Sequence, residues 1–261
     1  MRYQSIKFKS AFTILELLVV IAIVGILIAV LLPQVSKSRG EYDRCRMCIY
    51  KMKQIGIALR KYHDVYNVFP PTSTVDAEGK QLHSWRTLIL PYLEVTEDSP
   101  KIEGIQLDKS WDHELNKPFH DSMPNEFLCP SHWHNWHEKP PTTIYKMISG
   151  DKTAAGVSLS SMKRKPSEVI LLIEVGPPVP WMSPTNLSIE ELKEAIYPTG
   201  LEKTDPKEGY KTLEERNPQK KPIIGYAHPT EFHVLFADGT VKTYKNWKLP
   251  ISELEKRCRI E

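Results

Sequence analysis

The residues best suited to chemistry in this sequence are cysteines and histidines that gather in two short stretches. Cys45 and Cys48 lie three positions apart in a helical pattern. The second stretch contains Cys129, His132, His134 and His137. Thiolates and imidazoles are the ligands that zinc prefers, but predictive zinc motifs repeat a paired spacing, and these histidines are irregularly spaced. A metal site therefore stays open as an alternative, while our prediction is that the protein has no metal and no other cofactor.

Other side chains that could transfer protons lack an identifiable partner. His63 lies beside Asp64 at an expected helix end, where a capping or packing role is commoner than catalysis. Glu174 ends an apolar stretch without a second carboxylate, so we expect it to accept a structural hydrogen bond. His228 and Asp238 could form a pair, but spacing places no nucleophile beside them. We therefore expect a protein that is not an enzyme, with an exported hydrolase or metalloprotein as the alternative.

These candidates follow a long apolar stretch near the N-terminus. Residues 12–32 are apolar or neutral apart from Glu16, and about 20 such residues in a helix can cross the bilayer. A carboxylate there costs on the order of 2.5 kcal/mol and is usually kept for a function. The basic leader favours a cytoplasmic N-terminus. We expect a single-pass protein of the cytoplasmic membrane with its C-terminal part exported to the periplasm or cell surface; the alternatives are a removed secretory signal and a plain anchor.

The rest of the chain has the pattern of one α+β domain. The helical pattern continues to residue 65, and the later segments are expected strands at 142–150 and 168–175, a helix at 188–196 and a polar loop at 200–222. Asp238 and Gly239 indicate a hairpin with a two-residue turn, in which Gly239 supplies positive φ and Asp238 tolerates it. We expect a long N-terminal helix packed on an antiparallel sheet that ends in this hairpin.

Composition narrows the functional classes. The net charge of +3 is nearly balanced, and no dense Lys/Arg run with interleaved aromatic residues is present, so we expect no nucleic-acid partner. The sequence contains no Gly-rich phosphate-binding motif and no G-x-S-x-G motif. It has 4 cysteines, which allow several pairings in an oxidising compartment, and spacing alone does not choose among them.

The N-terminal stretch resembles that of type IV prepilins and pseudopilins, whose leader is cut just before a phenylalanine and whose fifth mature residue is a glutamate. The resemblance implies a leader over 1–11, cleavage between Ala11 and Phe12, and N-methylation of Phe12. The family usually has glycine where this chain has Ala11. Glu16 would pair with the terminal amine of a neighbouring subunit during assembly, which offsets the cost of burying both charges.

The remaining chain resembles a planctomycete family of pilin-like proteins of unknown function. The matching motifs, in order, are Lys53-Gln-Ile-Gly56, Leu90-Pro-Tyr-Leu-Glu94, Cys129-Pro-Ser131, Ile170-Leu-Leu-Ile-Glu174, and His228 with Asp238-Gly239. Cys48 falls at the family's cysteine position, and Cys45 is additional. In an exported protein, a Cys48–Cys129 disulfide would tie the helix to the head and contribute about 2–4 kcal/mol. His228 is expected to donate a hydrogen bond that locks the hairpin.

Together the resemblances imply a pilin-like fold with a leader over 1–11, an N-terminal helix over 12–65, of which 12–32 lie in the membrane, and an exported head over 66–261. The implied function is a non-enzymatic, membrane-anchored pseudopilin-like subunit that assembles into a filament or secretion apparatus. Its expected partners are membrane lipid, prepilin peptidase and other pilin-like subunits. The alternative is a membrane-tethered extracytoplasmic binding module that does not polymerise.

Overall fold

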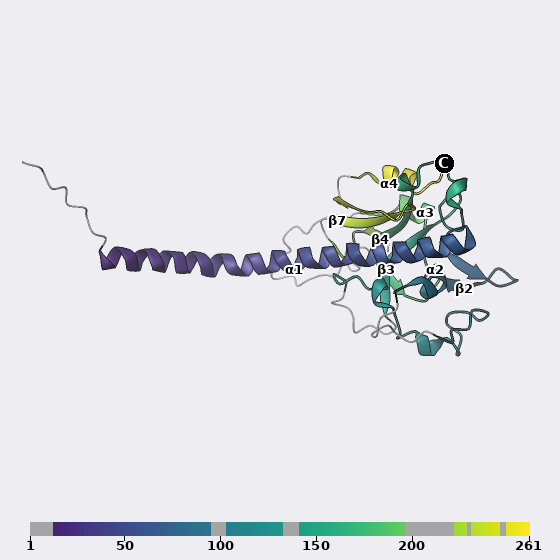
Figure 1. The fold of residues 1–261 in the computed structure, drawn as a ribbon, viewed down its shortest axis with the longest axis horizontal. Helices are drawn as coiled ribbons and strands as arrows, with labels where there is room; N and C mark the ends of the chain where they lie inside the picture. The colour runs from purple at the N-terminus through teal and green to yellow at the C-terminus, as the bar shows by residue number, and fades with distance from the viewer. Residues whose placement is uncertain (1–12, 95–102, 133–140, 197–221, 229–230, 246–248) are drawn as a thin grey trace, which may run out of the picture. The chain divides into compact units, whose positions relative to one another are not determined.

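The computed structural model describes residues 13–94, 103–132, 141–196, 222–228, 231–245 and 249–261, without side-chain detail for 29–42 (Figure 1). The first helix, α1, runs from Ile14 to Tyr66. By its internal contacts the chain divides into two units, Met1–Asp43 and Arg44–Glu261. Residues 44–66 of α1 therefore belong to the same unit as the sheet, and each unit is described below by itself.

The first unit contains the beginning of α1, which is closed by a reciprocal pair of hydrogen bonds. The backbone N–H of Glu16 donates to Thr13 Oγ1 (3.3 Å), and the backbone N–H of Thr13 donates to Glu16 Oε2 (2.9 Å). This is a capping box, in which a Thr and a Glu three residues apart satisfy donors at a helix start. The apolar side chains from Ile14 to Ile28 are largely exposed.

Within the part of the chain that the structure describes, no helix combines the length and the apolar character needed to cross a membrane. The expected span over 12–32 is thus not shown.

The second unit is built on a six-stranded, mostly antiparallel sheet. Its central order is β5 (Leu187–Ser188), β3 (Thr142–Ser149), β4 (Ile170–Pro180), β7 (Glu231–Phe236) and β8 (Val241–Lys245), with β6 (Ile223–Ile224) also paired to β4. The short β5 runs parallel to its neighbour β3, whereas the other strand pairs of this sheet in the described residues are antiparallel. The mixed α+β class and the antiparallel character agree with the sequence prediction.

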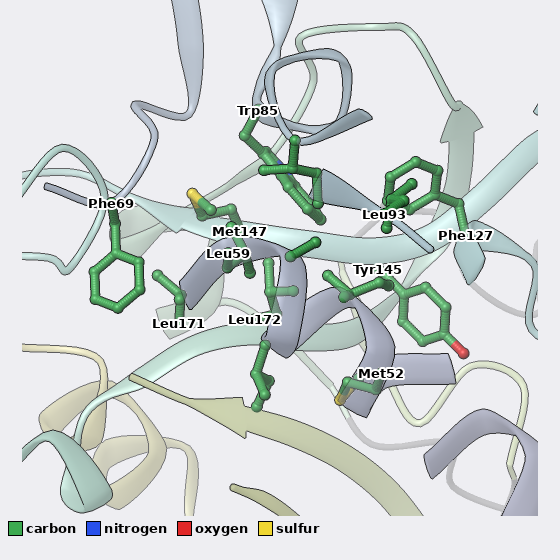
Figure 2. Close-up of a cluster of buried hydrophobic side chains, with 14 of the residues drawn as sticks. Met52, Leu59, Phe69, Trp85, Leu93, Phe127, Tyr145, Met147, Leu171 and Leu172 are labelled. Atoms are coloured by element: carbon green, nitrogen blue, oxygen red, sulfur yellow. The ribbon is translucent and has the colours of Figure 1, made fainter. Parts of the chain in front are cut away.

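Helices cover both faces of this sheet (Figure 1). On one face, residues 44–66 of α1 bury Met52, Ile55 and Leu59 against side chains of β3 and β4 (Figure 2). On the other face, α3 (Ile189–Lys193) and α4 (Ile251–Arg257) pack on the opposite side chains of β4 and β7. Burial on both faces explains why β4 is an almost continuous apolar run.

A segment of smaller elements contributes side chains to the core between α1 and the sheet. Its elements are β1 (Ser73–Val75) and β2 (Gln81–Ser84), which pair antiparallel, followed by α2 (Trp85–Leu88) and the 3₁₀ turn Leu90–Tyr92. Trp85, Leu90 and Leu93 are buried in the same core as α1, as the motif Leu90–Glu94 would require. This segment therefore serves to pack the helix.

Several expected elements are confirmed with changed ends. The strand expected at 142–150 is β3, and the strand expected at 168–175 continues through Gly176 to Pro180 as β4. The helix expected from Ser188 is the shorter α3, and Ser188 forms a capping box with Glu191. All but the last residue of the polar loop expected at 200–222 lies outside the described residues.

The predicted hairpin is present as β7–β8, but its turn is longer than the two residues expected. The amide of Gly239 donates to the carbonyl of Phe236 (2.9 Å), and the amide of Phe236 donates to the carbonyl of Thr240 (2.9 Å). Gly239 takes a φ of +90°, whereas Asp238 does not enter that region. The loop is therefore a three-residue turn closed by glycine. Asp238 instead accepts hydrogen bonds from the backbone N–H and hydroxyl of Thr240 (2.9 and 2.7 Å).

Candidate functional site

Among the described residues, the side chains best suited to bind a ligand or to react form a buried group of sulfur, nitrogen and oxygen atoms, which we call the thiol cluster. It consists of Cys48, Cys129, Glu174 and His228. One ligand atom from each of these residues lies within 4.8 Å of the others. All four side chains are buried, and they come from α1, the segment after the 3₁₀ turn Asn125–Phe127, β4 and the turn that precedes β7.

Local structure explains how each residue reaches the cluster. Cys48 lies one turn before Met52 on the face of α1 that packs against the sheet. Cys129 begins a tight turn in which its carbonyl accepts the amide of His132 (3.0 Å), and the amide of His228 closes a similar turn on the carbonyl of Gly225 (3.0 Å). Glu174 sits opposite Tyr145 in the β3–β4 pairing.

The distances in the thiol cluster are short. The Sγ atoms of Cys48 and Cys129 lie 2.8 Å apart. Nε2 of His228 lies 3.7 Å from Cys129 Sγ and 3.8 Å from Glu174 Oε1. On the other side of the imidazole ring, Nδ1 lies 3.2 Å from the Sγ of the half-buried Cys45. His228 therefore bridges the buried thiol pair and the additional cysteine.

A second ring of contacts holds Glu174 in place. Its Oε2 accepts the backbone N–H of His233 at 2.9 Å, which confirms the expected structural hydrogen bond. Its Oε1 has no hydrogen-bond partner among the described residues. The His233 ring stands 5.1 Å from the His228 ring, and its Nδ1 pairs with Thr243 Oγ1 (2.9 Å). One carboxylate oxygen is thus anchored, and the other faces His228.

Burial and mutual contacts shift the pKa values of the two thiols and of His228. Burial raises the pKa of the Cys48 thiol, and contact with Cys129 raises it further. Burial opposes ionisation of Cys129 too, but hydrogen bonds from Cys48 and His228 outweigh it and lower the pKa of Cys129 well below its ordinary value. Burial also opposes protonation of His228, yet its contacts with Cys129, Cys45 and Glu174 raise its pKa to about 11. The resulting pattern is an imidazolium beside a thiolate.

The other two titratable groups are held neutral near pH 7. Burial raises the pKa of Glu174 to about 8, against the opposing effect of the His228 charge. Burial and the same positive charge lower the pKa of His233 to about 4. The positive charge of His228 is therefore balanced by the negative charge of the Cys129 thiolate.

The structure places the residues predicted from sequence in different parts of the molecule. Ala11 and Phe12 lie outside the described residues. Asp238 and Gly239 form the hairpin turn, while the ring of His228 lies among the thiol-cluster atoms. Cys48 and Cys129 are brought together without a bond between their sulfur atoms, so the disulfide stays a prediction.

The histidine-rich stretch does not join the thiol cluster in the described residues. His132 is buried, and its Nε2 lies 3.2 Å from Thr142 Oγ1. His134 and His137 lie outside the described residues. The structure therefore does not test a metal site that includes His134 and His137. It brings together a different set of donors, which shares Cys48 and Cys129 with that alternative.

Sequence reasoning identified every member of the thiol cluster separately but did not group Glu174 and His228 with the cysteines. Their positions in the sequence are too far apart for a spacing rule, and the order of β4 and β7 in the sheet brings them together. The available signal was a carboxylate inside an apolar strand, because such a group needs a buried partner.

The arrangement can support a disulfide, bind a metal ion or provide a thiolate–imidazolium pair. Cysteine nucleophiles work when a substrate can reach the sulfur. Cys129 is 1% exposed and His228 is 2% exposed, which excludes direct attack on a substrate from this conformation. Among the residues that the structure describes, two sets of donors could hold a metal, namely the thiol cluster and the group of Cys45, His228 and His233.

Comparison with known proteins found two family matches. Residues 6–32 match the model described as the prokaryotic N-terminal methylation motif. Residues 44–168 match the model described as a protein of unknown function (DUF1559). The first match includes Phe12 and Glu16, and the second includes Cys48 and Cys129 but ends before Glu174 and His228. No curated protein and no solved structure matches the chain.

Proposed function

Because this chain is a pilin-like protein of unknown function that carries the prokaryotic N-terminal methylation motif, we propose that it is a non-enzymatic pseudopilin-like subunit anchored in the cytoplasmic membrane. Its leader is removed by a prepilin peptidase between Ala11 and Phe12, and the new amino terminus is methylated. The helix that follows stays in the membrane while the α+β head is exported to the periplasm or cell surface.

The observation that carries this proposal is the methylation motif over 6–32 together with Glu16 inside it. Such a carboxylate in an apolar stretch requires a partner, since an isolated buried charge is strongly destabilising. In the described helix its partner is Thr13, through the capping box. After cleavage, the terminal amine of Phe12 on a neighbouring subunit would offer a charged partner, and pairing of this kind supports assembly into a filament or secretion apparatus.

The head supports a structural role. Its sheet is covered by helices on both faces, and the thiol cluster is buried in the interior. Its partners in the proposal are other pilin-like subunits.

Mass spectrometry of the mature N-terminus tests the proposal. The full-length protein, expressed in a host with prepilin peptidase, should begin with methylated Phe12. Ala11→Gly should be processed at least as completely, because it keeps a small residue at the cut, and Ala11→Leu should retain the leader. An intact Met1 in the parent protein, or a cut beyond the apolar stretch, would contradict the proposed processing.

A further inference from the structure

We propose that the thiol cluster of Cys48, Cys129, Glu174 and His228, with its thiols reduced, is a binding site for one divalent metal ion of the zinc type. This inference concerns the interior of the head and does not rest on processing or assembly. It assigns a ligand to residues that neither matched family description explains.

The donor set fits zinc. Zinc in proteins takes four ligands from cysteine, histidine and acidic side chains in tetrahedral sites, at about 2.3 Å to sulfur and about 2.0–2.2 Å to nitrogen or oxygen. The thiol cluster offers two sulfurs, one imidazole nitrogen and one carboxylate oxygen within 4.8 Å of one another. Four donors from four separate segments converge on one buried point.

The separations need only local adjustment. Ligands at those bond lengths in a tetrahedron lie about 3.3–3.8 Å apart. His228 Nε2 already lies 3.7 Å from Cys129 Sγ and 3.8 Å from Glu174 Oε1. The two sulfurs, now 2.8 Å apart, would separate by about 1 Å, a shift that side-chain rotation can supply.

Glu174 gives a second, independent indication of a ligand. This wholly buried side chain turns Oε1 toward His228, and that oxygen accepts no hydrogen bond among the described residues. A buried polar atom without a partner is costly, and a cation at this point would satisfy it.

The atoms of His228 and Glu174 that point away from the proposed ion have the kinds of partners that are usual for metal-binding side chains. Ligating histidines usually have their other ring nitrogen paired, and ligating carboxylates are themselves hydrogen-bonded. Nδ1 of His228 lies 3.2 Å from Cys45 Sγ, and the second oxygen of Glu174 accepts the amide of His233. The atoms of these two residues that face the thiol cluster are then Nε2 of His228 and Oε1 of Glu174.

Charge at the site also suits a divalent cation. Two thiolates and one carboxylate exceed the charge of the ion by one negative charge. Lys51, one turn beyond Cys48 on α1, is 7% exposed and donates to Asn125 Oδ1 at 2.8 Å beside the Cys129 segment. A buried cation next to the site offsets the excess.

The same sulfur atoms can alternatively bond to each other. A Cys48–Cys129 disulfide removes both thiolates, so metal binding and the disulfide are mutually exclusive states of one site. The proposal therefore applies to the reduced protein, and the redox state decides whether the site is available.

Cobalt binding provides the test, because tetrahedral cobalt–thiolate sites absorb visibly while zinc is silent. The full-length protein in detergent is reduced without air, stripped of metal and titrated with Co²⁺, then with Zn²⁺. We expect a thiolate-to-cobalt charge-transfer band and tetrahedral visible bands that saturate at one ion per chain. Zn²⁺ should remove these bands, and oxidation of the thiols before titration should prevent them.

Conservative variants locate the ion. Cys48→Ser, Cys129→Ser and Glu174→Gln should each weaken Zn²⁺ binding by at least about 100-fold, and Cys45→Ser by about tenfold, because it acts through His228. Cys258→Ser is the matched control, because this buried thiol belongs to the core on the other face of the sheet and should leave binding unchanged. Circular dichroism of each metal-free variant checks that it folds.

Three results would overturn the proposal. One is a reduced, folded parent protein that shows no charge-transfer band. Another is equal binding by folded Glu174→Gln and the parent. The third is loss of binding in Cys45→Ser with retention in Cys48→Ser, which would place the metal on Cys45, His228 and His233 instead.

Discussion

At the scale of single residues, Lys146 places a charge inside the sheet at an energetic cost. Its side chain on β3 is 5% exposed and lies in a pocket lined also by Glu190, Glu191 and Glu194. Burial, and next the positive charge of Arg86, lower the pKa of Lys146 to about 8, while Glu191 opposes the change. The folded protein therefore releases this proton more easily than the unfolded chain does.

This difference predicts a pH dependence of stability. Between about pH 8 and the unfolded value of 10.5, the unfolded chain holds more protons, so the free energy of unfolding should rise with pH. Lys146→Met removes the titrating group and should stabilise the protein by about 1–3 kcal/mol at pH 7, with the gain disappearing by about pH 10.5. Urea unfolding of the two proteins at several pH values measures the gap. The exposed Lys165→Met serves as control, and a gap that does not vary with pH would contradict the prediction.

At the scale of elements, Gly56 sets how closely α1 approaches the β7–β8 hairpin. A Cβ atom at this position would lie 2.9 Å from Leu235 Cδ1 and 3.6 Å from the carbonyl oxygen of Gly239. Leu235 is fully buried, so it has little room to move. The glycine in Lys53–Gly56 is thus explained by packing between helix and hairpin.

Gly56→Leu should therefore destabilise the head by about 1–3 kcal/mol, despite the better helix propensity of leucine, because overpacking displaces the hairpin. Ile57→Leu is the matched control at the neighbouring position, which is 48% exposed and should change stability little. Thermal unfolding of both variants gives the comparison. Equal melting temperatures for Gly56→Leu and the parent would show that the contact is not tight.

At the scale of the whole molecule, the role of Glu16 separates a polymerising subunit from a tethered module. The capping box shows that this carboxylate also has a local function at the start of α1. Glutamine can replace glutamate in a capping box but carries no charge. The variant Glu16→Gln therefore distinguishes helix capping from charge pairing between subunits.

We expect both Glu16→Gln and Glu16→Ala to reduce crosslinked oligomers at least about tenfold while remaining in the membrane fraction, because loss of one charge leaves the terminal amine of the next subunit unpaired. Crosslinking in whole cells followed by fractionation measures both properties. If Glu16→Gln assembles like the parent, the charge is not needed. A parent protein that gives no oligomers favours the tethered binding module.

Local patterns in the sequence were sufficient for much of the fold. The strands expected at 142–150 and 168–175 correspond to β3 and β4, the helix expected at 188–196 contains α3, and the expected Gly239 closes the hairpin turn with positive φ. These signals are local because backbone hydrogen bonding, capping and positive φ depend on a few neighbouring residues. The exact hairpin loop differed from the prediction, since its length depends on how β7 and β8 pair.

Both family matches could be found from the sequence by itself, because the matched stretches, residues 6–32 and 44–168, are contiguous segments. Only the tertiary structure decided that Cys48, Cys129, Glu174 and His228 share one buried site. Their proximity depends on the order of strands in the sheet and on the packing of α1 across it. Side chains so far apart along the chain meet through long-range packing, and no spacing rule encodes that distance.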